Sequence, residues 1–334
     1  MPRELSKITG VKADVRTFSN EPSLACDKTL VGIELEIENS RKFNERASKL
    51  RLWSEVGERS LRNHGAEYVT PPIMGKDIVL AIDELRKHID GLSIKPVVTE
   101  RTGLHVHLDF RDATVQSLFR FVVVYTIFER FLFSQCEAGR EDNAYCTPLS
   151  ECDDLLTSMH RLTSTSERTA LRFLQDYPKY TAINLRPLTS LGTIEIRMHE
   201  GTVDPDKILR WVNLLLSIKR YSDESTASPQ NLVDFVCASP DEYFAAVFGN
   251  FAPVDYSESV YAGMLDGARA AQYMYRAKPV QLGSNEESLF VSLYGEQQAE
   301  KAPSKKTREG ILRGARETLT WATSAQAPAP DVFE

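Results

Sequence analysis

Hydrophobic and polar side chains alternate along several short segments in the N-terminal two thirds of the chain. The alternation is clean over residues 29–38, 97–110 and 193–200. A period of two is typical of a strand with one buried face. We therefore predict strands over these segments. We predict shorter strands over 180–186 and near 66–70, the latter ended by two prolines.

Segments in which apolar residues have a helical spacing lie between and after these strands. Two helices carry start signals: Thr114 precedes a long apolar helix that ends near residue 136, and Asp204-Pro205 opens a helix that ends near residue 221. A loop region with a short helix is predicted at about 41–54. Further helices are predicted over 76–89, 150–160, 165–176, 230–238, 240–248, 257–275 and 306–321.

This order of elements, strands mostly first and helices after, predicts an α+β fold. We divide the chain into an N-terminal extension (1–28), a catalytic domain (29–221) and a helical C-terminal region (222–321) that begins with a linker at 222–229. The final stretch, 322–334, is rich in Ala and Pro and is predicted to be disordered.

Composition and charge limit the function classes. The chain has 334 residues, of which 42% are hydrophobic, and a formal net charge of −7. This charge argues against a general nucleic-acid binder, because affinity for phosphate backbones comes mainly from Lys and Arg. The N-terminus lacks the apolar stretch of a secretory signal. The longest apolar segment, 118–133, contains Arg120, Glu129 and Arg130 and predicts a buried helix, not a membrane span.

The five cysteines form no CxxC pair, which favours a reducing compartment, and we expect the protein to be cytoplasmic. Cys146 and Cys152 lie near His160, a combination found in metal sites and nucleophile pairs. Their spacing matches neither pattern, so unrelated thiols are the preferred interpretation.

Acidic side chains share one face of the first predicted strand. In residues 31–38 the odd positions are apolar, and Glu34, Glu36 and Glu38 occupy the other face. Residues two apart on a strand are about 6.6 Å from each other, so these carboxylates repel unless they face solvent or bind cations. For this strand alone, a solvated outer face is the preferred interpretation.

The same arrangement recurs on the other strands, and together the strands favour a functional site over a solvated face. Most solvated faces are rich in Thr, Ser and Lys, whereas these faces have no Lys. They carry His105, His107 and Asp109 on one strand and Glu195, Arg197 and His199 on another, with Asn184, Arg186 and Glu67 on the remaining two.

Carboxylates on neighbouring strands supply the hard oxygen ligands that suit Mg²⁺ or Mn²⁺, and a histidine completes such a site. Arginine meets phosphate oxygens with two parallel donors, so the set predicts a site for metal-bound polyphosphate. The chain has no GxxxxGK[ST] loop, GxGxxG turn, GxSxG elbow or HExxH helix. His105 and His107 alone suggest zinc, but no third His or Cys stands at a typical spacing.

With these residues placed, the sequence resembles the amidoligase family, whose fold and site are similar to those of glutamine synthetase and glutamate–cysteine ligase. Five short motifs occur in the family's order, over about residues 30–220: GIELE (32–36), GAEYVTPP (65–72), GLHVH (103–107), YTAINLR (180–186) and GTIEIRMHEGT (192–202). One stretch departs from the family pattern, where Gly57–Leu61 replaces an Asp-Gly-Ser-like segment and leaves the role of Glu58 open.

The resemblance implies a curved antiparallel sheet with helices on its convex side and ATP and Mg²⁺ on its concave face. Metal ligands would be Glu34, Glu36, Glu67 and Glu195, completed by His105 or His107. Arg197 would contact the nucleotide phosphates, with Glu36 and Glu195 also catalytic. Asn184, Arg186 and His199 are further candidates for substrate or phosphate contact. Glu38 and Asp109 are expected to be solvated rim residues.

The implied reaction is ATP-dependent amide formation through an acyl phosphate, on an amino acid, a peptide or a protein side chain. Three alternatives stay open: a different metal-dependent phosphotransferase or phosphohydrolase, a non-catalytic nucleotide- or peptide-binding descendant, and a zinc hydrolase. The pattern chooses neither the substrates nor the oligomeric state.

Overall fold

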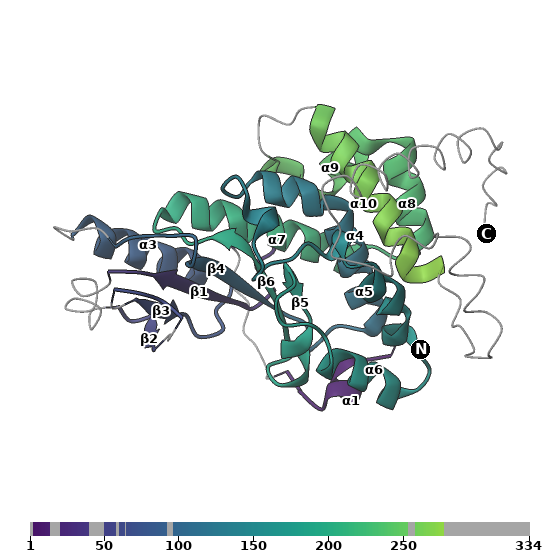
Figure 1. The fold of residues 1–334 in the computed structure, drawn as a ribbon, viewed down its shortest axis with the longest axis horizontal. Helices are drawn as coiled ribbons and strands as arrows, with labels where there is room; N and C mark the ends of the chain where they lie inside the picture. The colour runs from purple at the N-terminus through teal and green to yellow at the C-terminus, as the bar shows by residue number, and fades with distance from the viewer. Residues whose placement is uncertain are drawn as a thin grey trace, which may run out of the picture. The chain divides into compact units, whose positions relative to one another are not determined.

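An antiparallel sheet organises the described part of the chain (Figure 1). The computed structural model describes residues 3–13, 21–39, 50–57, 60–63, 65–91, 96–252 and 258–276. The sheet is six-stranded, with the order β2-β3-β1-β4-β6-β5, and every neighbouring pair is antiparallel. The strands are β1 (Val31–Ile37), β2 (Ser54–Val56), β3 (Ala66–Val69), β4 (Gly103–Asp109), β5 (Ile183–Asn184) and β6 (Thr193–Glu200).

Helices follow and interrupt the strands, so the fold is mixed α/β. The α-helices are α1 (Leu5–Thr9), α3 (Lys76–Asp90), α4 (Val115–Ser134), α5 (Asp153–Ser158), α6 (Glu167–Gln175), α7 (Pro205–Glu224), α8 (Pro229–Ala238), α9 (Pro240–Phe248) and α10 (Glu258–Arg276). Short 3₁₀ turns are η1 (Arg140–Asp142), η2 (Leu149–Glu151), η3 (Met159–Thr163), η4 (Arg186–Thr189) and η5 (Gly249–Phe251). No helix in the described ranges is both long and apolar enough to cross a bilayer.

The predicted helix starts are found where the sequence places them. The Thr114 side chain accepts a hydrogen bond from the Ser117 amide at the start of α4. Asp204 does the same for Asp206 and Lys207, with Pro205 in the first turn of α7. Such caps satisfy amides that have no partner within the helix.

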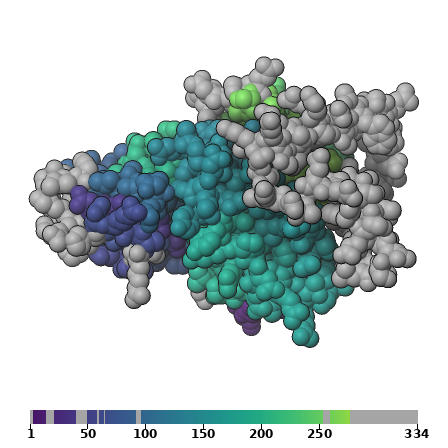
Figure 2. Space-filling model, in the orientation of Figure 1, coloured from purple at the N-terminus to yellow at the C-terminus, as the bar shows by residue number. Residues whose placement is uncertain are grey.

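One face of the sheet packs against helices. The apolar residues of β1, from Val31 to Ile37 at every second position, are completely buried. On β6, Met198 Sδ accepts a hydrogen bond from Tyr125 of α4, and the ring of His199 contacts Trp211 of α7. Figure 1 shows α3 and α7 running beside β1 and β4. In Figure 2 the teal surface of the middle of the chain lies directly beside the blue surface of its N-terminal part.

Both regions predicted to flank the catalytic domain contribute to the same hydrophobic core. Leu5, Ile8 and Leu24 are buried in it, and the Ala25 amide donates to the side chain of Asn213 on α7. At the other end, Tyr243 of α9 stacks on Phe128 of α4. All described residues belong to a unit that ends at Arg276. The boundaries predicted at residues 29 and 222 stay predictions.

The structure corrects several predicted elements. The strand predicted over 97–110 begins only at Gly103, because Thr99 and Thr102 bond to each other in a turn. The strand predicted over 180–186 shrinks to Ile183–Asn184, because a 3₁₀ turn begins at Arg186. The helix predicted over 150–160 is divided among η2, α5 and η3.

Two further segments differ from the prediction. Strand β2 is not among the predicted elements, and it begins at Ser54, where the region predicted as loop and short helix ends. The linker predicted at 222–229 is partly helical, because α7 continues to Glu224 with Ser222 fully buried. Of the region at about 41–54 that was predicted to include a short helix, residues 41–49 lie outside the described residues, as do the helix predicted at 306–321 and the tail at 322–334.

Candidate functional site

Acidic and imidazole side chains from neighbouring strands meet on the sheet face away from α3 and α7. Residues directly opposite each other in antiparallel strands point to the same face. Glu34 on β1 lies opposite His105 on β4, and Glu36 lies opposite Glu67 on β3. His107 on β4 lies opposite Glu195 on β6. The register therefore gathers all six predicted metal ligands on this face: Glu34, Glu36, Glu67, His105, His107 and Glu195.

Glu34 is the centre of this arrangement. Its Oε2 lies 3.4 Å from His105 Nδ1, and its Oε1 lies 3.1 Å from His107 Nε2. Within the described ranges, two groups of potential metal ligands share it. The first triad is Glu34, Glu67 and His105, and the second triad is Glu34, His107 and Glu195. Within each triad, the ligand atoms lie within 4.8 Å of one another.

Burial and charge act against each other at Glu34. Burial alone would raise the pKa of its carboxyl, but its contacts with His105 and His107 hold that pKa well below its usual range. For His107, burial lowers the pKa, whereas the Glu34 carboxylate beside it raises it above the usual value. Both shifts favour an ionised carboxylate next to a cation.

The two ring nitrogens of His107 have different surroundings, which bear on whether a metal ion fits here. The Nδ1 atom of His107 is bonded to Thr193 Oγ1 at 2.9 Å, which fixes the ring. Its Nε2 atom is buried and lies 3.1 Å from Glu34 Oε1, yet it forms no hydrogen bond of regular geometry within the described residues. A ring held through one nitrogen, with the other directed at carboxylates, is the usual arrangement of a metal-ligating histidine. The residues present therefore fit a divalent cation.

Glu195 is held in place from two sides. Arg197 Nη1 contacts its Oε1, and Asn184 Nδ2 donates to its Oε2 at 2.8 Å. Asn184 in turn accepts a hydrogen bond from the Arg186 amide. Asn184, predicted to contact substrate or phosphate, is thus positioned to orient Glu195. The Arg186 side chain is exposed at the start of η4, and the structure shows no contact between it and the triads.

Gly103 makes room for the histidine beside it. A Cβ atom at Gly103 would lie 2.6 Å from His105 Nε2 and 3.2 Å from Glu36 Oε2. Both distances are too short for ordinary contacts. The absent side chain therefore lets Glu36 and the outer edge of the His105 ring approach each other.

The prediction that His199 shares this face is wrong. Leu104 pairs with His199 and Val106 pairs with Ile196, so two residues of β6 lie opposite one of β4. This β-bulge turns His199 towards the helices, where its ring meets Trp211 with centroids 4.9 Å apart. Burial there lowers the pKa of His199. His199 therefore does not join the candidate site.

Arg140 stabilises the bulge, although nothing in its sequence context marks it as a structural or functional residue. The guanidinium is buried and donates to three consecutive carbonyls of β6: Nε to Met198 O at 3.1 Å, and Nη2 to Arg197 O at 3.3 Å and His199 O at 3.2 Å. Its segment has no strand or motif pattern, and a lone arginine in a loop is ordinarily a solvated residue. The signal exists only in the folded chain.

The expectation that Glu38 and Asp109 are solvated is also wrong, since both are about 95% buried or more. Glu38 Oε1 accepts a hydrogen bond from the Arg62 amide at 2.9 Å. Asp109 Oδ1 accepts from the Arg111 amide and from its Nε atom. These carboxylates anchor loops at the sheet margins.

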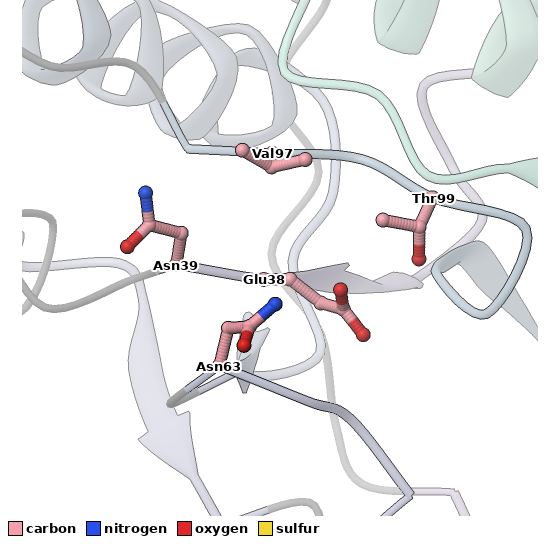
Figure 3. A pocket seen from close by; sticks show the side chains of 5 residues that line it. All are labelled: Glu38, Asn39, Asn63, Val97 and Thr99. Atoms are coloured by element: carbon pink, nitrogen blue, oxygen red, sulfur yellow. The ribbon is translucent and has the colours of Figure 1, made fainter.

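An open cavity of about 480 Å³ lies where β1 ends (Figure 3). Four of its five lining residues are of polar type, and Asn39 and Asn63 adopt left-handed backbone conformations beside it. Its lining side chains are Glu38, Asn39, Asn63, Val97 and Thr99. Glu38 directly follows β1, two residues after Glu36, so this cavity lies at the end of the polar face that includes the triads. Glu58, whose role the motif comparison left open, lies outside the described residues.

The cysteines take part in local packing. Cys146 Sγ donates to Arg140 O and Cys152 Sγ to Pro148 O, each at 3.3 Å. Burial raises the pKa of both thiols, that of Cys152 to about 12. All five cysteines are free. These properties suit packing and not nucleophilic catalysis.

Comparison with known proteins connects this site with one family. Residues 19–219 match the model of a family described as putative amidoligase enzyme. The match spans more than half of the 334-residue chain and includes every residue of both triads. No curated protein matches the chain.

Proposed function

The chain belongs to the putative amidoligase enzyme family, as its motifs predicted, and we propose that it is an ATP- and Mg²⁺-dependent ligase joining a carboxylate to an amine. The observation that carries this proposal is the sharing of Glu34 by two triads of metal-ligand atoms on one sheet face. We further propose that the sheet is of the glutamine-synthetase type and that the protein acts in the cytoplasm.

Charge supports a role for cations at this face. Glu67 and Glu195 each have a ligand atom within 4.8 Å of one on Glu34, while Glu36 lies beside His105. Carboxylates this close repel one another strongly where water is excluded, and the repulsion is relieved when a divalent cation binds. Mg²⁺ or Mn²⁺ suits the oxygen-rich set better than zinc. When bound, the ion would neutralise charge on the ATP phosphates.

Each protein group has a distinct task in this proposal. The two triads would hold the metal ions. Asn184 orients the Glu195 carboxylate of the second triad through a hydrogen bond. Arg197 would bind the phosphates through its planar guanidinium, which forms paired hydrogen bonds with phosphate oxygens. In this way the residues align the reactants and supply charge before the reaction begins.

The proposed reaction has two steps. An oxygen of the substrate carboxylate attacks the γ-phosphorus of ATP, forming a C–O–P linkage and breaking the bond to ADP. The amine nitrogen then attacks the acyl carbon, forming the C–N bond, while phosphate leaves and the nitrogen loses a proton. Exclusion of water is essential between the steps, because water would hydrolyse the acyl phosphate. We propose small-molecule or peptide carboxylates and amines as the substrates.

The test is release of ADP from ATP and Mg²⁺ with pools of carboxylates and amines. We expect ADP and a new amide only when both acceptor and donor are present. ADP release without any amine would instead identify a phosphohydrolase, and stoichiometric zinc in the purified protein would identify a zinc hydrolase. ATP binding without turnover in any pool would support a non-catalytic descendant. Each of these three results would contradict the proposal.

A further inference from the structure

Two exposed tyrosines lie together beside Arg197. Tyr145 is 58% exposed and Tyr180 is 47% exposed, although most large aromatic side chains in the described ranges are buried. Their ring centroids are 5.4 Å apart, with an interplanar angle of 82°. Aromatic surface left in water carries a cost in free energy that a ligand can recover by covering it.

The backbone around both tyrosines is well ordered by hydrogen bonds. Thr147 N donates to Tyr180 O at 2.9 Å, and Ala182 N donates to Thr147 O at 2.8 Å. The Tyr145 amide donates to Asn143 Oδ1 at 2.8 Å. The two loops are thus tied to each other immediately before β5. The rings therefore form a preorganised surface, which we call the tyrosine platform, and binding to it requires little additional ordering.

Arg197 connects the tyrosine platform with the second triad. Its Cζ atom lies 6.0 Å from the centroid of the Tyr180 ring, and its Nε atom lies 3.5 Å from Tyr145 O. Its Nη1 atom contacts Glu195 of the second triad. The Arg197 guanidinium therefore contacts Glu195 of β6 and also lies near the Tyr180 ring, in the loop before β5. Strands β5 and β6 are neighbours in the sheet (Figure 1). Lys179 adds a second positive charge, 5.5 Å from the centroid of the Tyr180 ring.

We propose that the tyrosine platform binds the base of the nucleotide, with the phosphates directed towards Arg197 and the triads. This inference rests on the proposed ATP dependence and adds the site of the base. A nucleotide has a polyanionic end and a planar aromatic end, which matches the sequence of charges and rings in this region. Stacking uses the π-face that every base has, so the platform itself should distinguish poorly between ATP and GTP.

The experiment compares two ligands, each with Mg²⁺, by calorimetry. One is a non-hydrolysable ATP analogue, and the other is inorganic tripolyphosphate, which has the charge but no base. In the variant Y145A/Y180A we expect affinity for the analogue to fall about 5- to 150-fold, the loss of one stacked base. Affinity for tripolyphosphate should stay within about 2-fold of wild type. The matched control Y145F/Y180F keeps both rings and should bind both ligands like wild type.

Each alternative result has a defined meaning. Unchanged affinity for the analogue in Y145A/Y180A would overturn the platform. An equal fall for both ligands would also overturn it, because it would show that the substitutions displaced Arg197. If wild-type protein bound neither ligand, the proposed ATP dependence itself would fail. Because both side chains are exposed, the variants should fold, and circular dichroism checks this.

Discussion

At the residue scale, Glu34 has a central place in the candidate site that the alternation of apolar and polar residues does not predict. The pattern distinguishes it in no way from Glu36 or Glu38, which share its strand face. In the structure it contacts both histidines of β4 and belongs to both triads, whereas Glu38 anchors a loop amide. Three acids with one pattern therefore have different surroundings, and they call for different experimental expectations.

The first prediction concerns metal binding by Glu34. Replacing Glu34 by Gln removes a ligand charge from both triads with little change in volume. We expect Mn²⁺ affinity, measured by electron paramagnetic resonance, to fall at least about 100-fold. Substitution of a residue that only supports a metal ligand typically lowers metal affinity by about 10- to 100-fold. Glu100→Gln, the same change on an exposed turn, is the control and should have no effect. Wild-type affinity in Glu34→Gln would eliminate the metal assignment.

The second prediction concerns Arg197 as the proposed phosphate ligand. In Arg197→Lys the charge remains but the planar pair of donors is lost. We expect kcat for ADP release to fall about 100-fold, because an ammonium cannot form the paired contact with phosphate oxygens. Arg168→Lys makes the same change in an exposed side chain of α6 that belongs to neither triad and should keep most activity. Equal rates for Arg197→Lys and wild type would make Arg197 a structural residue.

At the element scale, the β-bulge in β6 decides which residues enter the site. It leaves Glu195 and Arg197 together on the polar face and turns His199 towards α7. A bulge inserts one residue into a strand and changes the direction of the side chains that follow. Here its three carbonyls are satisfied by Arg140, a residue from outside the sheet.

The third prediction concerns Arg140. Arg140→Met keeps most of the side-chain length but leaves the carbonyls of Arg197, Met198 and His199 without their donor. We expect the free energy of unfolding in urea to fall by about 3 kcal/mol, because hydrogen bonds from a charged group are lost in a buried place. Arg140→Lys keeps one charged donor and should lose less. A loss below about 0.5 kcal/mol in Arg140→Met would show that the bulge does not need the guanidinium.

The fourth prediction concerns the protonation of His199. Because burial lowers its pKa, the unfolded chain takes up a proton below about pH 6.5 more readily than the folded chain. His199 should therefore reduce stability as the pH falls below that value. Its NMR titration should give a midpoint below that of an exposed histidine. His199→Phe should lose less stability than wild type between about pH 7.5 and pH 5, and an equal loss would contradict the assignment.

At the scale of the whole molecule, α4 joins the sheet to the C-terminal helices. Tyr125 of α4 contacts β6, while Phe128 and Phe131 pack against α9. Helix α10 crosses α4 closely at Gly267, where an added Cβ would lie 2.3 Å from Thr126 O and 2.6 Å from Ile127 O. The matched family segment ends at residue 219, yet the core continues through helices beyond it.

The fifth prediction tests this packing. Gly267→Ala forces α10 away from the α4 backbone, so we expect a loss of about 1–3 kcal/mol in the free energy of unfolding. Gly263→Ala is the matched control on the same helix, since its Cβ would meet only the Arg130 side chain, at 3.2 Å. That variant should lose little. If Gly267→Ala left the free energy of unfolding unchanged, the C-terminal helices would not belong to the same hydrophobic core as the sheet.

The sequence by itself determined the alternating strands β1 and β4, the capped starts of α4 and α7, and the residue types from which the candidate site is built. These features depend on local rules, namely the two-residue period of a strand and the need of helix amides for partners. Motif order also led to the family, which the match over residues 19–219 confirms.

Only the tertiary structure decided that His199 leaves the polar face, that Arg140 holds the bulge and that two exposed tyrosines stand beside Arg197. The physical reason is that strand register, bulges and loop contacts depend on partners far apart in the chain. An inserted residue reverses side-chain directions without changing the local alternation. Burial of Glu38 and Asp109 likewise depends on loops that no strand pattern describes.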